Sequence, residues 1–320
     1  MRRSARNPIL TRADIPDVSP LVADVTSVFN PGAIKLGDRY VLLPRVQTRG
    51  RETVFILAES RDGESFTVQR RLLSIEGVDD LGIEIFHIYD PRLTKIGDDV
   101  FIVFAADCEG ACHLGVARTR DFQRLELVSF QRELDSRNGV LFPEKLNGQF
   151  MRLERPNRTR LANGVMTGSE IVLSRSNDLV TWNIVAPVMA GRLHFWDELI
   201  GSGPPPVKTR EGWLHVYHGV ATHFAAANIY QAGVCLLDLN DPSKVIARGR
   251  NNILEPREIY ELVGQVPNVV FPSGMIIEEF DSEGFARPDS LVRIYYGAAD
   301  TVIGLATTTV RELIEAARVE

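Results

Sequence analysis

The sequence predicts an all-β fold, a five-bladed β-propeller with a short C-terminal helix. Three observations lead to this prediction. Short runs rich in β-branched and aromatic residues recur along the chain, Gly, Asp, Asn and Pro lie between them, and the resulting strand pairs form a degenerate repeat. Long helical periodicity is nearly absent from the 320 residues. A β-sandwich with coincidental turns is the alternative fold.

Five segments carry the repeat, and four of them share one plan: Pro, then Lys, a polar turn, and a strand that opens with an apolar residue. These four are NPGAIKLGDRYVLLPRV, DPRLTKIGDDVFIVFAAD, FPEKLNGQFMRLERP and GPPPVKTREGWLHVYHGV. The fifth, which starts at Phe271, is looser and has a longer hairpin. Each segment predicts a hairpin, and several are followed by a second one, such as AESRDGESFTV. Two hairpins make one four-stranded blade, so five units predict five blades.

The C-terminal segment TTTVRELIEAARVE predicts the clearest helix. Thr309 can cap its first turn, and Glu312 three residues later completes a capping-box pattern. No linker or low-complexity segment divides the chain. Residues 1–320 are therefore expected to form a single propeller domain.

Composition restricts the partners and the compartment. A net charge of −6 and a pI of about 5.6 argue against a broad nucleic-acid or anionic-membrane surface. No apolar run has the length of a signal peptide or of a membrane span. Three cysteines favour a reducing compartment, so we expect a cytoplasmic protein. Cys108 and Cys112 lack a second pair and the six histidines are scattered, so no metal is expected.

Polar residues recur where a propeller brings its blades together. The innermost strands of a propeller line a central channel, so equivalent repeat positions converge on one axis. The polar and glycine positions at the starts and ends of the repeat strands are Asn30, Arg45, Asp90, Asp107, Arg155, Gly203, His218 and Asp300. Because buried charges without partners are costly, such a ring either pairs internally or binds a polar ligand.

Asp90 is the candidate acid. It follows the apolar segment GIEIFHIY, whose shielding is expected to raise the pKa of the carboxyl group toward that of a useful general acid. The alternative is an ordinary turn Asp before Pro.

Four further residues form a candidate oxyanion site. Arg137, Asn138 and Arg155, together with His218 of the neighbouring repeat, offer donors that match a tetrahedral anion. Surface salt bridges are the alternative role for these arginines.

Several further residues could belong either to the active site or to the structural framework. Asp197 and Glu198 are either a second carboxylate for a hydrolase or a loop feature, and Trp196 either stacks on a sugar ring or belongs to the core. Lys208 occupies the repeat lysine position, which by itself predicts a structural role.

Six motifs in order make the chain similar to glycoside hydrolase family 130, the β-mannoside phosphorylases and their relatives: DPRLT, SRNGVLFPEK, IGSGPPPVK, VYHG, VVFPSG and YYGAAD. The resemblance implies inverting attack of inorganic phosphate on a β-mannoside, giving α-mannose 1-phosphate. The mannoside is a β-1,4- or β-1,2-linked manno-oligosaccharide or a mannosyl-glucose. The resemblance further implies phosphate as co-substrate, no cofactor and a homo-oligomer. A β-mannoside hydrolase on the same propeller is the alternative.

The resemblance also implies roles for individual residues. Asp90 matches the general acid. The positions that match phosphate-binding residues are Arg137, Asn138, Arg155 and His218. The positions that match residues around the transferred mannose are Asn30, Arg45, Lys208 and Asp300. Tyr89 departs from the family pattern, which often has Glu directly before the DPR motif. The basic set favours phosphorolysis over hydrolysis.

Overall fold

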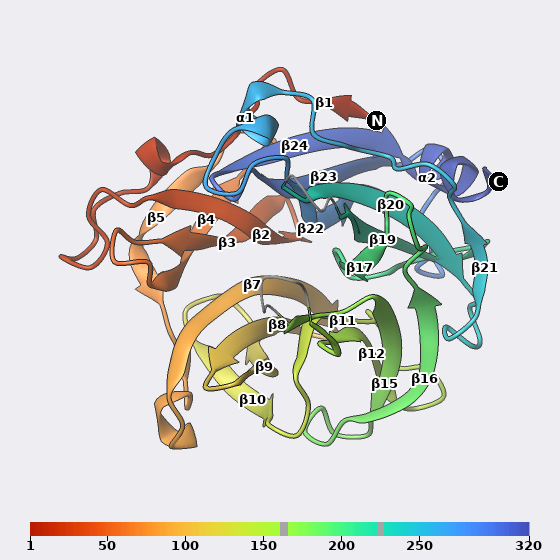
Figure 1. Ribbon diagram of the computed structural model, residues 1–320, viewed down its shortest axis with the longest axis horizontal. Coiled ribbons are helices and arrows are strands. Elements are labelled where there is room, and N and C mark those ends of the chain that lie inside the picture. The colour runs from red at the N-terminus through yellow and green to blue at the C-terminus, as the bar shows by residue number, and fades with distance from the viewer. Residues whose placement is uncertain (161–165, 223–226, 320) are drawn as a thin grey trace.

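The computed structural model describes residues 1–160, 166–222 and 227–319, and these form five sheets around a central axis (Figure 1). The arrangement confirms the predicted five-bladed propeller. In blades 1 to 3 the strands run outward from the axis in chain order. The N-terminus lies on blade 5, and the C-terminal helix α2 lies where blades 4 and 5 meet (Figure 1). No helix in the described ranges is long and apolar enough to cross a membrane.

The strands of blade 1 are β2 (Ser27–Leu36), β3 (Arg39–Gln47), β4 (Thr53–Ser60) and β5 (Thr67–Leu73). Those of blade 2 are β7 (Ile85–Ile96), β8 (Asp99–Cys108), β9 (Ala111–Thr119) and β10 (Leu125–Gln131), with β6 (Ile75–Glu76) parallel to β10. Those of blade 3 are β11 (Ser136–Leu141), β12 (Phe150–Pro156), β15 (Glu170–Ser176) and β16 (Asn183–Ala190). Blade 4 has β17 (Leu199–Ser202), β18 (Val207–Thr209), β19 (Gly212–Ala221), β20 (Ile229–Leu237) and β21 (Val245–Arg248). Blade 5 has β22 (Val270–Ile277), β23 (Leu291–Ala298), β24 (Val302–Thr309) and β1 (Arg2–Arg3).

The remaining elements are short. The strands β13 (Thr159–Arg160) and β14 (Met166–Thr167) pair with each other beside blade 3. The helices are η1 (Arg12–Asp14), η2 (Asp79–Leu81), α1 (Ile259–Leu262) and α2 (Val310–Ala317). The predicted capping box at Thr309 and Glu312 is present at the start of α2. The apolar face of α2 packs into a core cluster with residues of blades 4 and 5.

Two blades depart from the simple repeat. In blade 4 the inner strand is split into β17 and β18, which both pair with β19. The intervening Pro204, Pro205 and Pro206 cannot continue a ladder, because proline has no N–H to donate. In blade 5 the outermost strand is β1, from the other end of the chain, with Arg2 opposite Thr307. The N-terminus therefore closes the ring.

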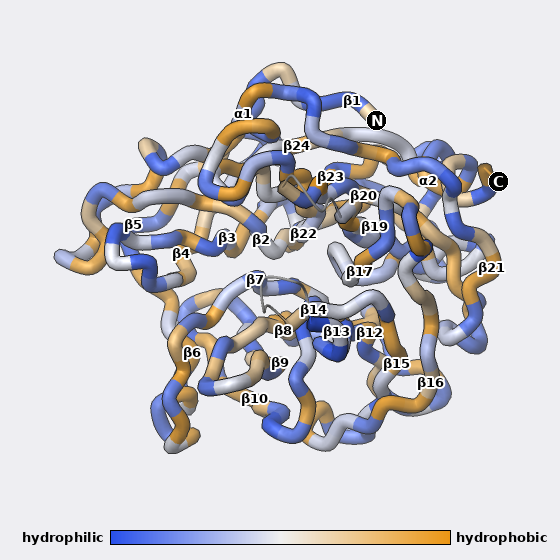
Figure 2. The backbone as a smooth tube through the Cα atoms, viewed as in Figure 1, coloured by the Kyte–Doolittle hydropathy of each residue, from blue (hydrophilic) through white to orange (hydrophobic). Residues whose placement is uncertain are grey.

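Apolar side chains fill the spaces between blades. For example, Val41 and Leu43 of blade 1 share one cluster with Ile102 and Phe104 of blade 2, and all four are at most 1% exposed. Figure 2 shows apolar stretches within the strands and hydrophilic segments at many of the turns. Because the blades are held by this packing, the ends of the inner strands form a rigid frame around the axis.

Candidate active site

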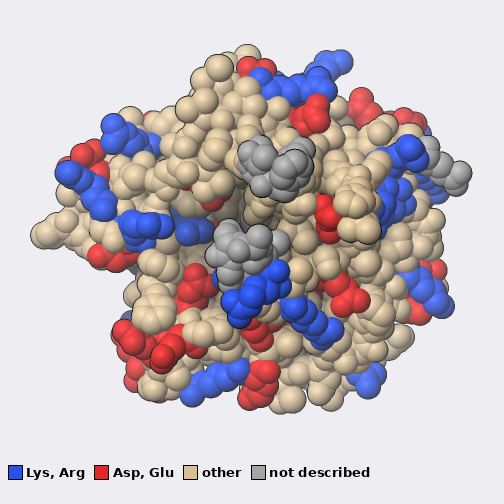
Figure 3. All heavy atoms as spheres, viewed as in Figure 1, with Lys and Arg blue, Asp and Glu red and all other residues tan. Residues whose placement is uncertain are grey.

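One end of the axis carries a cavity of about 220 Å³ to which all five blades contribute. Figure 3 shows a hollow at the centre of this face. The cavity is lined by Asn30, Arg45, Tyr89, Asp90, Arg137, Asn138, Arg155, His218, Tyr230, Val266, Val269, Phe271 and Asp300. Of the nine residues assigned to the site from the sequence, all except Lys208 line the cavity. Of the eight repeat positions predicted to converge on the axis, six line it, whereas Asp107 and Gly203 do not.

Three of these residues occupy the same special backbone position. Asn30, Asp90 and Asn138 each lie in a β-bulge of the innermost strand of their blade. Their φ angles are 45°, 53° and 53°, in the left-handed region that Asn and Asp adopt more readily than most residues. A bulge bends the strand and redirects the side chain, and bulges recur beside active sites. The backbone thus aims one polar side chain from each of blades 1, 2 and 3 into the cavity.

Asp90 is buried mainly by polar neighbours. Its Oδ1 accepts a hydrogen bond from Asn30 Nδ2 at 2.9 Å and lies 3.5 Å from Arg45 Nη1. The Asp90 side chain is 11% exposed. Of the segment expected to shield the carboxyl group, Phe86 is 50% exposed, whereas Tyr89 is 6% exposed and lines the same cavity. One close donor and one cation contact the carboxylate.

Asp300 is a second carboxylate in the cavity. It lies in the turn between β23 and β24, with φ of 48°. Burial raises the pKa of Asp300 to about 6, the positive charge of Arg45 opposes this shift, and the negative charge of Asp90 adds to it. Arg45 itself is fixed between two aromatic rings, with its guanidinium carbon 4.6 Å from the Phe29 centroid and 4.7 Å from that of Tyr89.

The opposite side of the cavity is basic. Arg137 of β11 and Arg155 of β12 are direct cross-strand partners. Burial and the charge of Arg137 lower the pKa of Arg155 to about 10, so Arg155 stays charged at neutral pH. Burial, Arg155 and Arg92 hold the pKa of His218 well below its ordinary value. A neutral imidazole has one N–H donor, so His218 adds a donor without adding charge.

Close approach of the blades depends on Gly201 of β17. A Cβ at this position would lie 2.4 Å from His218 Cε1 and 2.6 Å from Asn138 Oδ1. Any larger residue would displace one of these two side chains. Glycine at 201 is therefore a requirement of the cavity, independent of its backbone conformation.

Several buried polar atoms of the cavity have no hydrogen-bond partner within the described ranges. They are Asn30 Oδ1, Arg45 Nε, Arg137 Nε, Asn138 Oδ1, Arg155 Nε and both ring nitrogens of His218. Buried polar groups in folded proteins are nearly always paired, so a cluster of unpaired ones indicates a site that binds a polar ligand. The donors gather on blades 3 and 4, which fits an anion on that side.

Sequence reasoning missed some lining and supporting residues. Tyr230 of β20 lines the cavity, and no repeat signal marked it. Phe271 stacks on His218 at 4.5 Å; a recurring aromatic next to the repeat proline, seen also at Phe29 and Tyr89, was the available signal.

Arg92 of the DPR motif was also missed, and it supports the cavity from below. It is 1% exposed and donates from Nε to Gly203 O at 2.7 Å and from Nη1 to Asp90 O at 3.0 Å. Because Gly203 lies in blade 4 and Asp90 in blade 2, Arg92 joins the inner strands of two blades that are not neighbours in the ring.

Lys208 is not brought to this cavity, and its assignment to the mannose-binding set is corrected. Its Nζ lies 2.6 Å from Glu144 Oε1 and over the Phe285 ring. It lines a separate hollow of about 390 Å³ together with Lys35 and Lys95. In β7 the cavity residue Asp90 and the hollow residue Lys95 are five positions apart, and five strand residues rise about 16 Å, so the repeat lysines gather at the far end of the axis.

Asp197 and Glu198, the candidate carboxylates for a hydrolase, are also not among the described residues that line the cavity. Asp197 is fully buried and bonded to Arg192 at 2.8 Å, Arg248 at 2.6 Å and Tyr217. Glu198 accepts a hydrogen bond from Thr222. Trp196 stacks on Tyr217, which makes it part of the blade packing.

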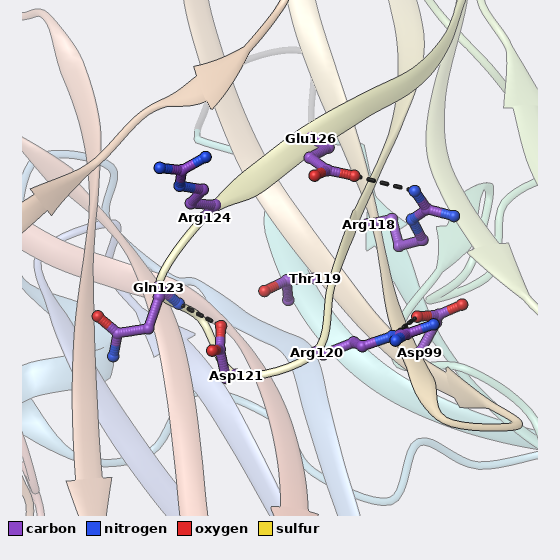
Figure 4. Close-up of a pocket in the computed structure, with 8 residues that line it drawn as sticks. All are labelled: Asp99, Arg118, Thr119, Arg120, Asp121, Gln123, Arg124 and Glu126. Carbon is purple, nitrogen blue, oxygen red and sulfur yellow. Dashed lines mark hydrogen bonds and ion pairs between the residues drawn. The ribbon is translucent and has the colours of Figure 1, made fainter.

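A larger hollow, of about 480 Å³, lies at the outer part of blade 2 (Figure 4). Its charged residues largely satisfy one another, since Arg118 pairs with Glu126 and Arg120 with Asp99. The side chains of Arg118, Glu126 and Arg120 are each at least 45% exposed. The axial cavity, with its unpaired buried donors, is therefore the stronger candidate.

Comparison with known proteins agrees with this site. The family model described as β-1,4-mannooligosaccharide phosphorylase, that of glycoside hydrolase family 130, matches residues 1–318. The β-1,4-mannooligosaccharide phosphorylase of Ruminococcus albus is 30% identical over 316 residues, which cover 97% of this chain and 88% of that one. The β-1,2-mannobiose phosphorylase of Listeria innocua is 33% identical over 267 residues, covering 82% and 68%. A solved structure of β-1,2-mannobiose phosphorylase from Listeria innocua in complex with β-1,2-mannobiose superposes with a TM-score of 0.83 at 27% identity, covering 99% of this chain and 98% of the other. The chain is therefore an enzyme of glycoside hydrolase family 130.

Proposed function

We propose that this enzyme cleaves a β-mannoside with inorganic phosphate, inverting the anomeric centre and releasing α-mannose 1-phosphate. The observation that carries the proposal is the division of the cavity into two sides. Asp90, with Asn30 and Arg45 against it, forms one side. The second side consists of Arg137, Asn138, Arg155 and His218, and each of the four has a buried polar atom without a hydrogen-bond partner in the described structure.

Each side supplies one requirement of an inverting displacement. Asp90 is the proposed acid for the leaving oxygen. The basic side holds phosphate on the opposite face of the sugar ring, where the anion attacks the anomeric carbon. Phosphate is already a nucleophile, so the displacement needs no carboxylate base. Asn30, Arg45 and Asp300 are the proposed contacts of the mannose that is transferred, because they lie beside Asp90.

Hydrolysis is the competing proposal, and one feature supports it. Asp300 is a second carboxylate in the same cavity, and a base of this kind could activate water. The basic side argues against it, because water needs neither two guanidinium groups nor the neutral imidazole of His218. Phosphorolysis is therefore the function that the geometry supports best.

The related proteins leave the linkage open. Their names specify β-1,4-mannooligosaccharide, β-1,2-mannobiose and, at 27% identity in Bacteroides fragilis, 4-O-β-D-mannosyl-D-glucose. We propose a substrate within this set, with phosphate as co-substrate and no cofactor. The three free cysteines, two of them buried, support the proposal of a cytoplasmic protein. The homo-oligomer stays a prediction.

The decisive experiment measures α-mannose 1-phosphate released from β-1,4-mannobiose, β-1,2-mannobiose and mannosyl-glucose, with and without phosphate. We expect product only when phosphate is present, from one of the three substrates in preference to the others. Free mannose formed at the same rate in phosphate-free buffer would instead establish a hydrolase.

A further inference from the structure

Each of the two arginines of the basic side is held from behind by a carboxylate outside the cavity. These carboxylates are Asp107, near the end of β8, and Asp135, directly before β11. Neither is among the described residues that line the cavity. Both are connected to the arginines by hydrogen bonds, Asp107 directly and Asp135 through Asn157.

Asp107 fixes Arg137. A single oxygen, Asp107 Oδ1, accepts from Arg137 Nη2 at 3.1 Å and from the Tyr89 hydroxyl at 2.7 Å. Burial holds the pKa of Tyr89 well above its ordinary value, so its hydroxyl keeps the proton that it donates. The Tyr89 ring also lies 5.9 Å from the guanidinium carbon of Arg137. Arg137 is thus oriented by one ion pair and one aromatic ring.

Asp135 fixes Arg155 through an intermediate amide. Arg155 Nη2 donates to Asn157 Oδ1 at 3.2 Å, and Asn157 Nδ2 donates to Asp135 Oδ1 at 2.7 Å. The same oxygen of Asp135 accepts the backbone N–H of Cys112 at 3.0 Å. The backbone N–H of Asn157 also donates to the carbonyl of Asp135 at 2.9 Å. This chain of bonds uses Arg155 Nη2 and leaves Arg155 Nε without a partner in the described structure.

Both supporting carboxylates depend on one hairpin of blade 2. Asp107 lies in this hairpin, and Asp135 accepts a hydrogen bond from its residue Cys112. Asp107 and Cys112 are cross-strand partners in the β8–β9 pair of blade 2, whereas Arg137 and Arg155 belong to blade 3. Two guanidinium groups directly opposite each other repel, and arginine side chains have many rotamers. Without a fixed frame they would separate in the absence of an anion. The blade 2 hairpin supplies that frame.

We propose that Asp107 and Asp135 are positioning residues of the phosphate site, which hold Arg137 and Arg155 in the geometry that receives the anion. This inference rests on the proposed function. Its physical content is preorganisation: donors already in place bind an anion without the entropy loss of ordering them. A pure charge effect has the opposite sign, because a carboxylate behind the site repels phosphate. The two effects can therefore be separated by experiment.

The test compares Asp107→Ala with Asp107→Asn in initial-rate assays at varied phosphate, on the substrate that the wild-type enzyme cleaves. Asn keeps an oxygen where Asp107 Oδ1 accepts its two bonds, whereas Ala removes it. We expect Asp107→Ala to raise KM for phosphate about 10- to 100-fold with kcat within about threefold, and Asp107→Asn to stay within about threefold of wild type in both. Asp99→Ala is the matched control, because it removes an ion pair to Arg120 at the other end of the same strand.

Two further variants keep the test decisive if Asp107→Ala does not fold. Tyr89→Phe keeps the ring and removes only the hydroxyl donor to Asp107, and we expect it to raise KM for phosphate about three- to tenfold. Asn157→Ala cuts the chain between Asp135 and Arg155 and should raise the same constant about tenfold or more. An unchanged or lowered KM for phosphate in these variants overturns the inference, as does an Asp107→Asn variant as impaired as Asp107→Ala.

The wild-type arm separates this inference from the proposed function. Wild-type turnover that needs no phosphate overturns both together. The other outcome concerns the positioning role alone. That role is overturned if the wild-type enzyme requires phosphate but the Asp107→Ala, Tyr89→Phe and Asn157→Ala variants bind inorganic phosphate with wild-type affinity in calorimetric titrations.

Discussion

Arg137 and Arg155 face each other directly across the β11–β12 pair of blade 3. Like charges at directly opposed positions destabilise a strand pair, so this arrangement costs stability unless an anion lies between the two groups. Burial and the neighbouring Arg137 lower the pKa of Arg155 to about 10, which still leaves it charged at neutral pH. The proposed phosphate site rests on this pair of opposed guanidinium groups.

The first prediction concerns phosphate affinity. Arg155→Ala and His218→Ala each remove one donor from the basic side, and we expect KM for phosphate to rise about 10- to 100-fold. Added phosphate should raise the melting temperature of the wild-type protein, because a ligand of the folded state stabilises it, and should raise it less in both variants. Arg120→Ala, an exposed arginine of blade 2, is the control. An unaltered phosphate dependence would remove these residues from the phosphate site.

The second prediction concerns the acid. Asp90→Asn keeps the size of the side chain and its contact with Asn30 but cannot deliver a proton. We expect turnover to fall about 10³-fold or more, with the melting temperature nearly unchanged. Rates with a natural mannoside, together with a thermal unfolding scan, check this. Turnover at the wild-type rate would show that another group protonates the leaving oxygen.

The third prediction concerns stability and pH. The pKa of Asp300 is raised from an ordinary 3.8 to about 6 in the folded protein, mainly by burial. Below about pH 4 the carboxyl group is protonated in both the folded and the unfolded chain, so it does not change the free energy of unfolding. Between about pH 4 and pH 6 the unfolded chain ionises this carboxyl group while the folded chain keeps it protonated. The folded state therefore loses up to about 3 kcal/mol of stability over this range, and the loss levels off above pH 6.

Asp300→Asn has no such ionisation. We therefore expect its stability relative to wild type to improve between about pH 4 and pH 6 and to level off above pH 6, as measured by denaturant unfolding from pH 4 to pH 7. Asp98→Asn, in an exposed turn, serves as the comparison. A difference between Asp300→Asn and wild type that does not vary with pH would contradict the raised pKa.

The fourth prediction concerns close packing in the cavity. Gly201→Ala places a methyl group 2.4 Å from His218 Cε1 and 2.6 Å from Asn138 Oδ1, so these two residues of the proposed phosphate site must shift. We expect KM for phosphate to rise about tenfold or more. Gly115→Ala is the matched control, since its methyl group would collide with Phe104, and neither residue is among the described residues that line the cavity. That variant should lose stability while its phosphate dependence stays normal.

Much of the site could be predicted from the sequence because a propeller repeats one local pattern about one axis. The strand runs and turns are local signals, and five copies of them predict five blades. Residues at equivalent repeat positions, such as Asp90, Arg155 and Asp300, then had to converge, and the structure brings them together. The helix cap at Thr309 and Glu312 is equally local.

Long-range geometry decided the rest. In blade 3 the repeat proline Pro143 lines the hollow that contains Lys208, not the cavity. The position equivalent to Asn30 and Asp90 is instead the bulge at Asn138, five residues earlier. A bulge inserts residues without a fixed sequence signature, so strand register could not be derived from the repeat. Lys208 is a different case: the family resemblance implied a place beside the mannose, whereas its repeat position predicts the structural role that agrees with its ion pair to Glu144.

The sequence by itself determined the number of blades and the chemical types that meet on the axis, because both follow from local patterns repeated five times. Only the tertiary structure decided which ends of the inner strands meet, that β1 closes blade 5, and that Asp107 of blade 2 supports Arg137 of blade 3. These contacts join residues tens to hundreds of positions apart. Their existence depends on the packing of whole blades, which no short segment encodes.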